Sequence, residues 1–332
     1  MRRKLLWSLT VLVGAVATVV LLRAREPDLL SNAVRMPYVA LGANGTVYSC
    51  ASSSSDEIVM LKSFSFGSET PITRLNIKSG KSADFTVKGV PWGDPGFNGM
   101  GPFSPDGRWL LHFTNSDPGE CVLVDLVKSR ATRRKGRGLG WPTWSNDSQG
   151  WLRRSLNGDF CVYEIQAPKV RIVKPAKPVG DVELWYDRNR EYVVTYHFAG
   201  EDVSPTEFYE TSLAGRPTSE RLGIRIPTGA VISEAELSAD GRHVLWWLEF
   251  RKPKSDWLER LLTWFHRPAS TAPNGALTEG IWISRPDGSD FKALGRVKAE
   301  PAPEGLHAVG WMPDSSRVFF FYKHGMYIKP IE

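Results

Sequence analysis

The sequence predicts an all-β fold, six copies of a four-stranded unit that follow an apolar N-terminal segment. Three observations carry this prediction. The 332 residues include 13 Trp, 30 Gly and 23 Pro, a composition that favours pleated strands and turns over a helical bundle. A short turn sequence recurs along the chain, and the copies are regularly spaced. With 42% hydrophobic residues, the chain can bury a substantial core.

The N-terminal segment from Leu5 to Leu22 carries no charge across 18 residues. As a helix it would be about 27 Å long, against about 30 Å for the hydrocarbon core of a bilayer. No small-residue cleavage site precedes Arg23, so we expect a transmembrane signal-anchor helix at 5–22, with a removed signal peptide as the alternative. Basic residues at positions 2 to 4 favour a cytoplasmic 1–4 region and a single-pass cell-membrane protein whose bulk is extracytoplasmic, periplasmic or extracellular.

The repeat is clearest at "FSPDGRWLLHF", which begins at Phe103. Each copy has an aromatic residue or Leu, a short polar turn and an apolar strand. The steps between copies are 41 residues (104 to 145 and 145 to 186), 52 (186 to 238) and 74 (238 to 312). The positions equivalent to Ser104 are Ser145, Tyr186, Ser238 and Met312, and a weaker copy lies around Gly45.

The polar turns are interpreted as structural. Asp106 with Gly107, and Asp240 with Gly241, suit tight hairpins in which Gly adopts a left-handed backbone. At the same position we place Gly45 and Asn189, which also tolerate that backbone, and Ser148 and Ser315, whose presence the sequence does not explain. The spacing of Ser, Asp and Gly does not match a sialidase-type aspartate box.

Between the turns, each unit contains four short strands, and a period near 40 residues with four strands is typical of a propeller blade. We therefore expect a six-bladed β-propeller, with five or seven blades as alternatives. These units, together with the outer hairpin "IWISRPDGS" at Ile281, resemble the WD40-like propeller repeats of TolB-type proteins from Pro37 to Glu332. The last copy lacks a fourth strand, which the linker 23–36, at Ser31 to Met36, is expected to supply.

Local motifs for catalysis or metal binding are absent from the sequence. There is no Gly-x-Ser-x-Gly elbow and no His-Glu-x-x-His pattern, so no catalytic, cofactor-binding or metal-binding residue is assigned and no cofactor is expected. His112 and His243 are interpreted as structural histidines on second strands. Cys121 and Cys161 begin the third strands of adjacent units, too far apart for a disulfide, and are expected to be buried free thiols.

The formal charge of +6 is spread over 42 basic and 36 acidic residues, which does not indicate nucleic-acid binding. One basic run falls in the fourth strand of its unit. Charge on an edge strand discourages pairing with other sheets, and the alternative is contact with an anionic lipid or partner. The run comprises Arg130, Arg133, Arg134, Lys135 and Arg137.

The longest step contains an insertion, 252–279, with the sequence "SDWLERLLTWFHR" beginning at Ser255. Its apolar spacing predicts an amphipathic helix on the face opposite the polar turns. This helix could cap the central channel, dock a partner or membrane surface, or pack on its own blade. The candidate contact residues are Trp257, Leu261, Trp264 and Phe265.

From the sequence we therefore expect a membrane-anchored, non-catalytic protein-binding or scaffolding module of the cell envelope. The alternative is a propeller-type hydrolase or lyase with its site at the mouth of the central channel. An axis lined by apolar residues would favour binding, and several inward-facing His and carboxylates would favour an enzyme.

Overall fold

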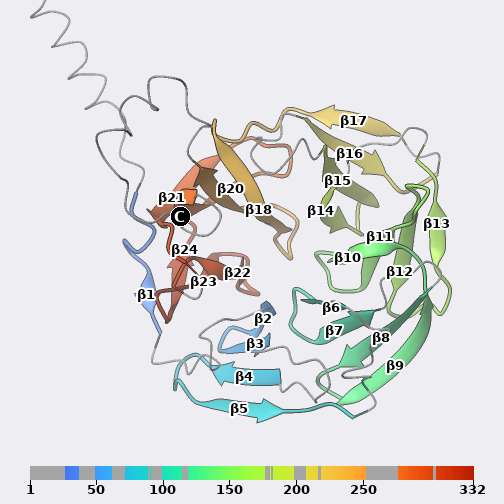
Figure 1. Ribbon diagram of the computed structural model, residues 1–332, viewed down its shortest axis with the longest axis horizontal. Coiled ribbons are helices and arrows are strands. Elements are labelled where there is room, and N and C mark those ends of the chain that lie inside the picture. Colours follow the sequence, from blue (N-terminus) through green and yellow to red (C-terminus); the bar gives the residue numbers. More distant parts are fainter. Residues whose placement is uncertain are drawn as a thin grey trace, which may run out of the picture.

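Six four-stranded antiparallel sheets, the blades of a β-propeller, are arranged in a ring (Figure 1). This confirms the all-β class and the count of six blades. The structure is a computed structural model. It describes residues 27–36, 49–61, 72–88, 90, 99–113, 119–175, 180, 182–197, 207–215, 218–251, 276–301 and 304–332.

The first strand of each blade lies nearest the centre of the ring and the fourth lies at its rim (Figure 1). Blades 1 to 3 comprise β2 (Ser49–Ser54), β3 (Glu57–Leu61), β4 (Ile72–Asn76) and β5 (Ser82–Phe85); β6 (Gly99–Phe103), β7 (Trp109–Phe113), β8 (Gly119–Asp125) and β9 (Arg130–Gly136); and β10 (Leu139–Trp144), β11 (Gly150–Arg154), β12 (Phe160–Glu164) and β13 (Arg171–Val173).

Blades 4 to 6 follow the same order around the ring. They comprise β14 (Val182–Asp187), β15 (Tyr192–Tyr196), β16 (Phe208–Ser212) and β17 (Ser219–Leu222); β18 (Ala230–Leu237), β19 (Val244–Arg251), β20 (Ala276–Ser284) and β21 (Lys292–Lys298); and β22 (His307–Trp311), β23 (Arg317–Tyr322), β24 (Gly325–Pro330) and β1 (Val34–Arg35).

The hydrophobic core is divided among the seams between blades. Each of six buried clusters draws its residues from two neighbouring blades. Blades 6 and 1, for example, meet through Phe319 and Phe321 on one side and Ile58 and Met60 on the other. A single sheet would expose two apolar faces, so each blade depends on both neighbours and the ring is the stable unit.

The repeated turns between first and second strands are closed by hydrogen bonds that the sequence explains. The Ser104 hydroxyl donates to Asp106 at 2.5 Å and accepts from the Trp109 amide at 2.9 Å. Ser238 and Asp240 form the same pattern, and Gly107 and Gly241 have φ of 63° and 70°. We call the side of the ring that carries these turns the turn face, and the opposite side the connection face.

Ser148 and Ser315 occupy the same left-handed position, with φ of 58° and 54°. The substitution of Ser for Gly therefore left the turn geometry unchanged. In blade 4 the sequence alignment was wrong, because the residue with positive φ is Glu191 (φ 52°) and its amide donates to the Arg188 carbonyl at 3.2 Å. Asn189 is not the equivalent of Gly107, since β14 continues to Asp187 and shifts the turn along the chain.

The turn of blade 1 also differs from its sequence prediction. The first and second strands of this blade are β2 and β3, which are joined between Ser54 and Glu57. Gly45 precedes β2 and lies outside the described residues. The Gly45 assignment was therefore wrong, because the turn between the first and second strands of this blade lies at Ser54 to Glu57.

The ring closes by pairing the two ends of the described chain. β1 adds to β24 in antiparallel register, Val34 opposite Ile328, and completes blade 6 beside the strand that ends the sequence (Figure 1). The Met36 amide also donates to the Met326 carbonyl at 2.9 Å. β1 falls within the segment Ser31 to Met36 that the sequence offers for closure.

The residues before β1 also fasten to blade 5. The Leu29 amide donates to the Arg296 carbonyl at 3.0 Å, and the Arg296 amide donates to the Pro27 carbonyl at 2.9 Å. Leu29 is fully buried in the core between blades 5 and 6. Residues 27–36, which we call the clasp, therefore hold two blades together.

Two helical predictions, at 5–22 and within 255–267, lie outside the described residues. No helix in the described ranges is long and apolar enough to cross a membrane. The insertion is shorter than expected, because β19 and β20 stay paired as far as Arg251 and Ala276. Residues 276–279 therefore belong to β20, and the connecting segment is 252–275.

Cys121 and Cys161 lie on β8 and β12, the third strands of blades 2 and 3, as the spacing predicted. Both are buried within the core that joins these blades, and neither is in a disulfide. The expectation of buried thiols is confirmed.

Candidate functional site

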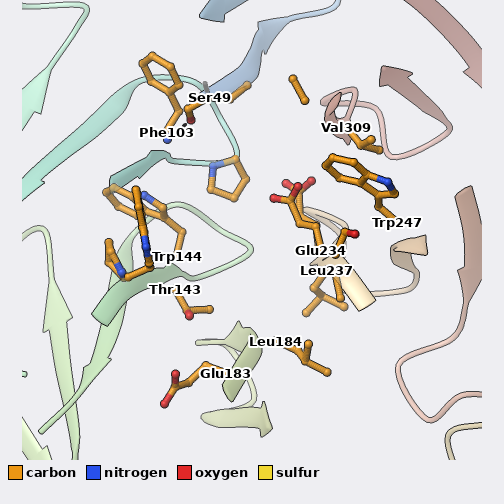
Figure 2. Close-up of a pocket in the computed structure, with 18 of the residues that line it drawn as sticks. Ser49, Phe103, Thr143, Trp144, Glu183, Leu184, Glu234, Leu237, Trp247 and Val309 are labelled. Atoms are coloured by element: carbon orange, nitrogen blue, oxygen red, sulfur yellow. Dashed lines mark hydrogen bonds between the residues drawn. The ribbon is translucent and has the colours of Figure 1, made fainter. Parts of the chain in front are cut away.

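The six innermost strands surround a cavity of about 880 Å³ on the axis of the ring. We call it the hub cavity. Figure 2 shows Trp144 and Thr143 on one side of it and Glu234 with Trp247 on the other. A volume of this size matches the range of sites that hold small molecules or segments of chain.

One side of the hub cavity is an aromatic wall contributed by blades 2 and 3. It comprises Phe103, Pro105, Trp141, Pro142 and Trp144. Trp144 is held in place by Trp151, whose ring centroid lies 5.4 Å away, and Trp151 stacks on Tyr163 at 4.9 Å. The wall is therefore rigid.

Trp141 is the exposed member of this wall, with 67% of its surface accessible. It contacts Phe113 edge to face, with centroids 5.8 Å apart. Since β10 starts at the connection face, Trp141 lies toward that face of the hub cavity. A large exposed aromatic residue at the rim of a cavity is typical of a binding surface.

The opposite side carries two carboxylates, Glu234 and Glu236, on the innermost strand of blade 5. Residues two apart on a strand share a face, and a register shift between Ile232 and Glu234 sets which face that is. We call them the acidic pair. In the described part of the chain, neither carboxylate has an ion-pair partner, and no Lys or Arg lines the cavity.

The surroundings of the acidic pair raise the pKa of both carboxyl groups. Burial within the ring raises the pKa of Glu234 to about 7. Burial, and then the charge of Glu234, raises the pKa of Glu236 to about 8. By accessible surface, Glu234 is exposed to the cavity and Glu236 is half-buried, and the surrounding protein replaces part of the bulk water that would stabilise their charge.

Two further ionisable groups face the cavity from blades 1 and 6. The Cys50 thiol donates to the Ala308 carbonyl at 3.6 Å, and burial and the acidic pair raise its pKa well above the usual value. The His307 ring lies 2.8 Å from the Gly305 carbonyl through Nδ1, and burial lowers its pKa. Both groups are neutral at pH 7 and do not offset the acidic pair.

Several polar atoms of the lining have no hydrogen-bond partner among the described residues, namely Trp247 Nε1, His307 Nε2 and Asn146 Oδ1. Asn146 is 4% exposed, and its Nδ2 donates to the Ala239 carbonyl at 3.5 Å, which leaves Oδ1 as an acceptor. Because Asn146 belongs to blade 3 and Ala239 to blade 5, their turns meet across the turn face. The exposed Trp141 lies toward the other end.

The hub cavity can therefore bind apolar and aromatic groups together with a cation or hydrogen-bond donors. No group of three or more His, Cys, Asp or Glu in the described ranges is placed to hold a metal ion. The feature compatible with catalysis is the acidic pair, because carboxylates with pKa values near 7 can transfer protons. The lining is mostly apolar, as expected of a binding site, and it also includes Glu183, Glu234, Glu236 and His307, the groups expected of an enzyme, so it meets part of each expectation.

The basic run lies on β9 and, at Arg137, just after its end, at the rim of blade 2 and away from the hub cavity. Arg134 is engaged in structure, since its guanidinium donates to the carbonyls of Glu164, Ile165 and Ala167 in blade 3. Arg133 pairs with Glu120 at 3.5 Å. Arg130, Lys135 and Arg137 are exposed.

The sequence reading did not identify the acidic pair. Its signal was the alternation in "SEAEL", Ser233 to Leu237, which places two Glu on the first strand of a blade, where the other inner strands are mostly apolar or aromatic. For Trp141, the signal was that the residue lies on the first strand of blade 3. Trp257, Leu261, Trp264 and Phe265 lie outside the described residues.

Solved structures similar to this chain share its fold. A putative TolB from Agrobacterium tumefaciens is 13% identical, with 86% of this chain and 90% of that one covered and a TM-score of 0.50. An oligogalacturonate lyase in complex with manganese is 11% identical (90% and 96% covered, TM-score 0.47), and the Myceliophteria thermophila Cps50 (Swd1) β-propeller domain is 12% identical (90% and 100%, 0.45).

No family model matches the sequence, and no curated protein does. The resemblance to TolB-type propellers is confirmed at the level of the fold. At these identities the likeness does not extend to an activity or a partner.

Proposed function

We propose that this protein is a non-catalytic binding module of the cell envelope, which holds a segment of a partner protein in its hub cavity. The observation that carries the proposal is the aromatic wall, with Trp141 67% exposed at its rim. Aromatic side chains on a rigid support supply much of the binding energy at protein interfaces. The closed ring provides that support.

The N-terminal segment 5–22 is proposed to anchor this module in the cell membrane, with the propeller outside the cytoplasm. Its uncharged length and the basic residues before it support the proposal. We expect the full chain to stay in the membrane pellet after alkaline carbonate extraction and to be degraded by protease added to spheroplasts, from which any outer membrane or wall has been removed. Release by carbonate, or protection from protease, would contradict this topology.

The helix predicted within 255–267 and the exposed basic residues of β9 are proposed as additional contacts. Residues 252–275 join β19 to β20 at the connection face, toward which Trp141 also lies. Trp257, Leu261, Trp264 and Phe265 would extend the aromatic surface beyond the hub cavity. Arg130, Lys135 and Arg137 would meet anionic lipid or an acidic region of the partner.

Site-specific photo-crosslinking tests the binding proposal. A photoreactive amino acid replaces Trp141 in the full-length membrane protein. The matched control is Val127, which is 68% exposed on the outer hairpin of blade 2. We expect a discrete adduct from position 141 that is absent from position 127 and is lost when Ala235→Trp fills the cavity. The same adducts from both positions, or persistence with the cavity filled, would refute the proposal.

A second candidate function, a hydrolase or lyase, is favoured by the acidic pair alone. In that case protonated Glu236 would act as the general acid, since its pKa of about 8 keeps it protonated at pH 7. Once a ligand is identified, Glu236→Gln separates the two functions. If turnover of the wild type is lost while ligand binding persists, the protein is an enzyme.

A further inference from the structure

We propose that the partner segment held in the hub cavity presents a basic side chain, Lys or Arg, to Glu234 and Glu236. This inference rests on the proposed function and names the chemical group that the cavity recognises. It follows from three features of the described residues: two carboxyl groups without an ion-pair partner, aromatic and apolar neighbours, and the hydrogen-bonding atoms left open in the lining.

The acidic pair differs from several carboxylates on neighbouring blades in having no counter-charge. Glu183 is paired with Arg154 at 2.5 Å, and Asp147 is paired with Arg188 at 2.8 Å. Glu234 and Glu236 have no such partner in the described part of the chain, and no basic side chain lines the cavity. A carboxylate without a counter-charge in a partly desolvated site attracts a cation from outside.

The neighbours of the acidic pair suit the stem of a long basic side chain. Glu234 pairs across the strands with Trp247, and Figure 2 shows the Trp247 ring beside the carboxylate. Ala235, Ala308 and Val309 complete this side of the cavity with small apolar surfaces. A Lys or Arg side chain can lay its methylenes on such surfaces and its charge over an aromatic face.

The open hydrogen-bonding atoms favour a peptide over a bare cation. Asn146 Oδ1 requires a donor, whereas Trp247 Nε1 can only donate. An extended peptide offers both, because its backbone has an amide and a carbonyl at each residue while its basic side chain supplies further donors. A metal ion would leave the indole donor unused.

Proton release provides a further signature. The raised pKa values leave the acidic pair partly protonated at pH 7, and a bound cation favours the ionised forms. Binding should therefore release protons and tighten as the pH rises from about 6 to about 9. The other titratable groups around the pair are Cys50 on β2, Glu183 and Tyr196 on blade 4, Glu249 on β19 and His307 on β22.

The test selects peptides from a random display library against the full chain in lipid nanodiscs. Three proteins are compared: the wild type, Glu234→Gln with Glu236→Gln, and Glu220→Gln. Glu220 is exposed on β17, at the rim of blade 4, so this variant controls for the loss of a carboxylate. Thermal unfolding of each protein checks that the fold is retained.

We expect Lys or Arg at a fixed position in peptides selected by the wild type and by Glu220→Gln. The double variant should bind these peptides about 10- to 100-fold more weakly, the range for a charge-assisted hydrogen bond. Replacing the basic residue of the peptide by norleucine should cause a similar loss. The wild type should bind more tightly as the pH rises, and the double variant should not.

Two results would overturn the inference. Peptides that require Trp141 but show no basic preference would refute it and leave the proposed function intact. Competition by butylammonium or spermidine, with no selected peptide, would identify a free amine as the ligand and refute the peptide. If no selected peptide binds more weakly to Trp141→Ala, the proposed function itself fails.

Discussion

At the scale of single residues, the turn positions show how much sequence variation one backbone geometry tolerates. Ser148 and Ser315 adopt the left-handed conformation that Gly107 and Gly241 adopt without strain. A non-glycine residue in this conformation costs about 1–2 kcal/mol. Ser148 recovers part of this cost, because its hydroxyl accepts a hydrogen bond from the Asp106 amide at 2.9 Å.

Because of this difference, Ser→Gly substitutions at the two positions should have different effects on stability. Ser315→Gly should raise the free energy of unfolding by about 0.5–1 kcal/mol, since it removes the backbone strain. Ser148→Gly should give no net gain, because the contact with Asp106 is lost with the hydroxyl. Urea denaturation of both variants measures the difference, and equal gains would show that the inter-turn hydrogen bond is not stabilising.

Glu279 gives a second prediction at this scale. It is 7% exposed, and burial raises its pKa to about 7 even though the Leu306 amide donates to it at 2.8 Å. The folded state therefore holds a proton that the unfolded state releases above its ordinary pKa of about 4.3. Its contribution to stability is fully present below that value and is lost as the pH rises to about 7.

Glu279→Gln should flatten this dependence, because the amide keeps an oxygen for Leu306 and does not ionise. We expect the variant to be more stable than the wild type at pH 8 by up to about 3 kcal/mol, and similar to it at pH 4. Denaturation curves at both pH values test this, with Glu220→Gln as the exposed control. A variant that loses stability at pH 8 would contradict it.

At the scale of elements, the clasp explains how the ring is fastened. Gly295 on β21 has φ of 153°, and a Cβ placed there would lie 2.4 Å from the Leu29 Cα. The backbone of the clasp occupies the space that any side chain would need. Glycine at this position is therefore required by the close approach of two chain segments that are distant in sequence.

Gly295→Ala should accordingly displace the clasp from blade 5 and lower the free energy of unfolding by about 1–3 kcal/mol. Gly223, whose Cβ would meet no atom within 4 Å, provides the matched control, and Gly223→Ala should change stability by less than about 0.5 kcal/mol. Hydrogen exchange of the Leu29 and Met36 amides should accelerate only in the first variant. Unchanged exchange would show that the clasp tolerates a side chain there.

At the scale of the whole molecule, closure makes the six seams interdependent. The core between blades 6 and 1 forms between segments at opposite ends of the sequence, as Figure 1 shows for β24 and β3. β1 contributes only two residues to the ring, Val34 and Arg35. The short pairing of β1 with β24 is extended by a hydrogen bond from the Met36 amide to the Met326 carbonyl.

Met36→Pro removes that amide and should loosen the closing strand. We expect a loss of about 1–2 kcal/mol in the free energy of unfolding, the cost of one backbone hydrogen bond and its local distortion. Protection of β24 amides against hydrogen exchange should fall, while β11 in the middle of blade 3 should change only with global stability. Uniform changes in both blades would indicate that opening of the ring is not local.

The sequence determined the propeller class and the blade count, because turn chemistry and apolar strands are local signals that repeat. It also located the buried cysteines and the segment that offers a closing strand. The repeat alignment failed at Asn189, because β14 continues to Asp187, and at Gly45, because the turn of blade 1 comes after β2. Local sequence patterns do not show where a strand ends, because the end of a strand depends on its hydrogen bonds to the neighbouring strand.

Only the tertiary structure decided what faces the axis. Glu234 and Glu236 are ordinary surface-type residues in the sequence, and their charge becomes uncompensated because the ring surrounds them with apolar walls and no basic neighbour among the described residues. Trp141 likewise becomes a candidate contact residue only in the folded ring, where it lies at the rim of an aromatic wall formed by two blades. A site assembled from six separate strands exists only after the ring closes, because its lining residues lie on strands that are far apart in the sequence.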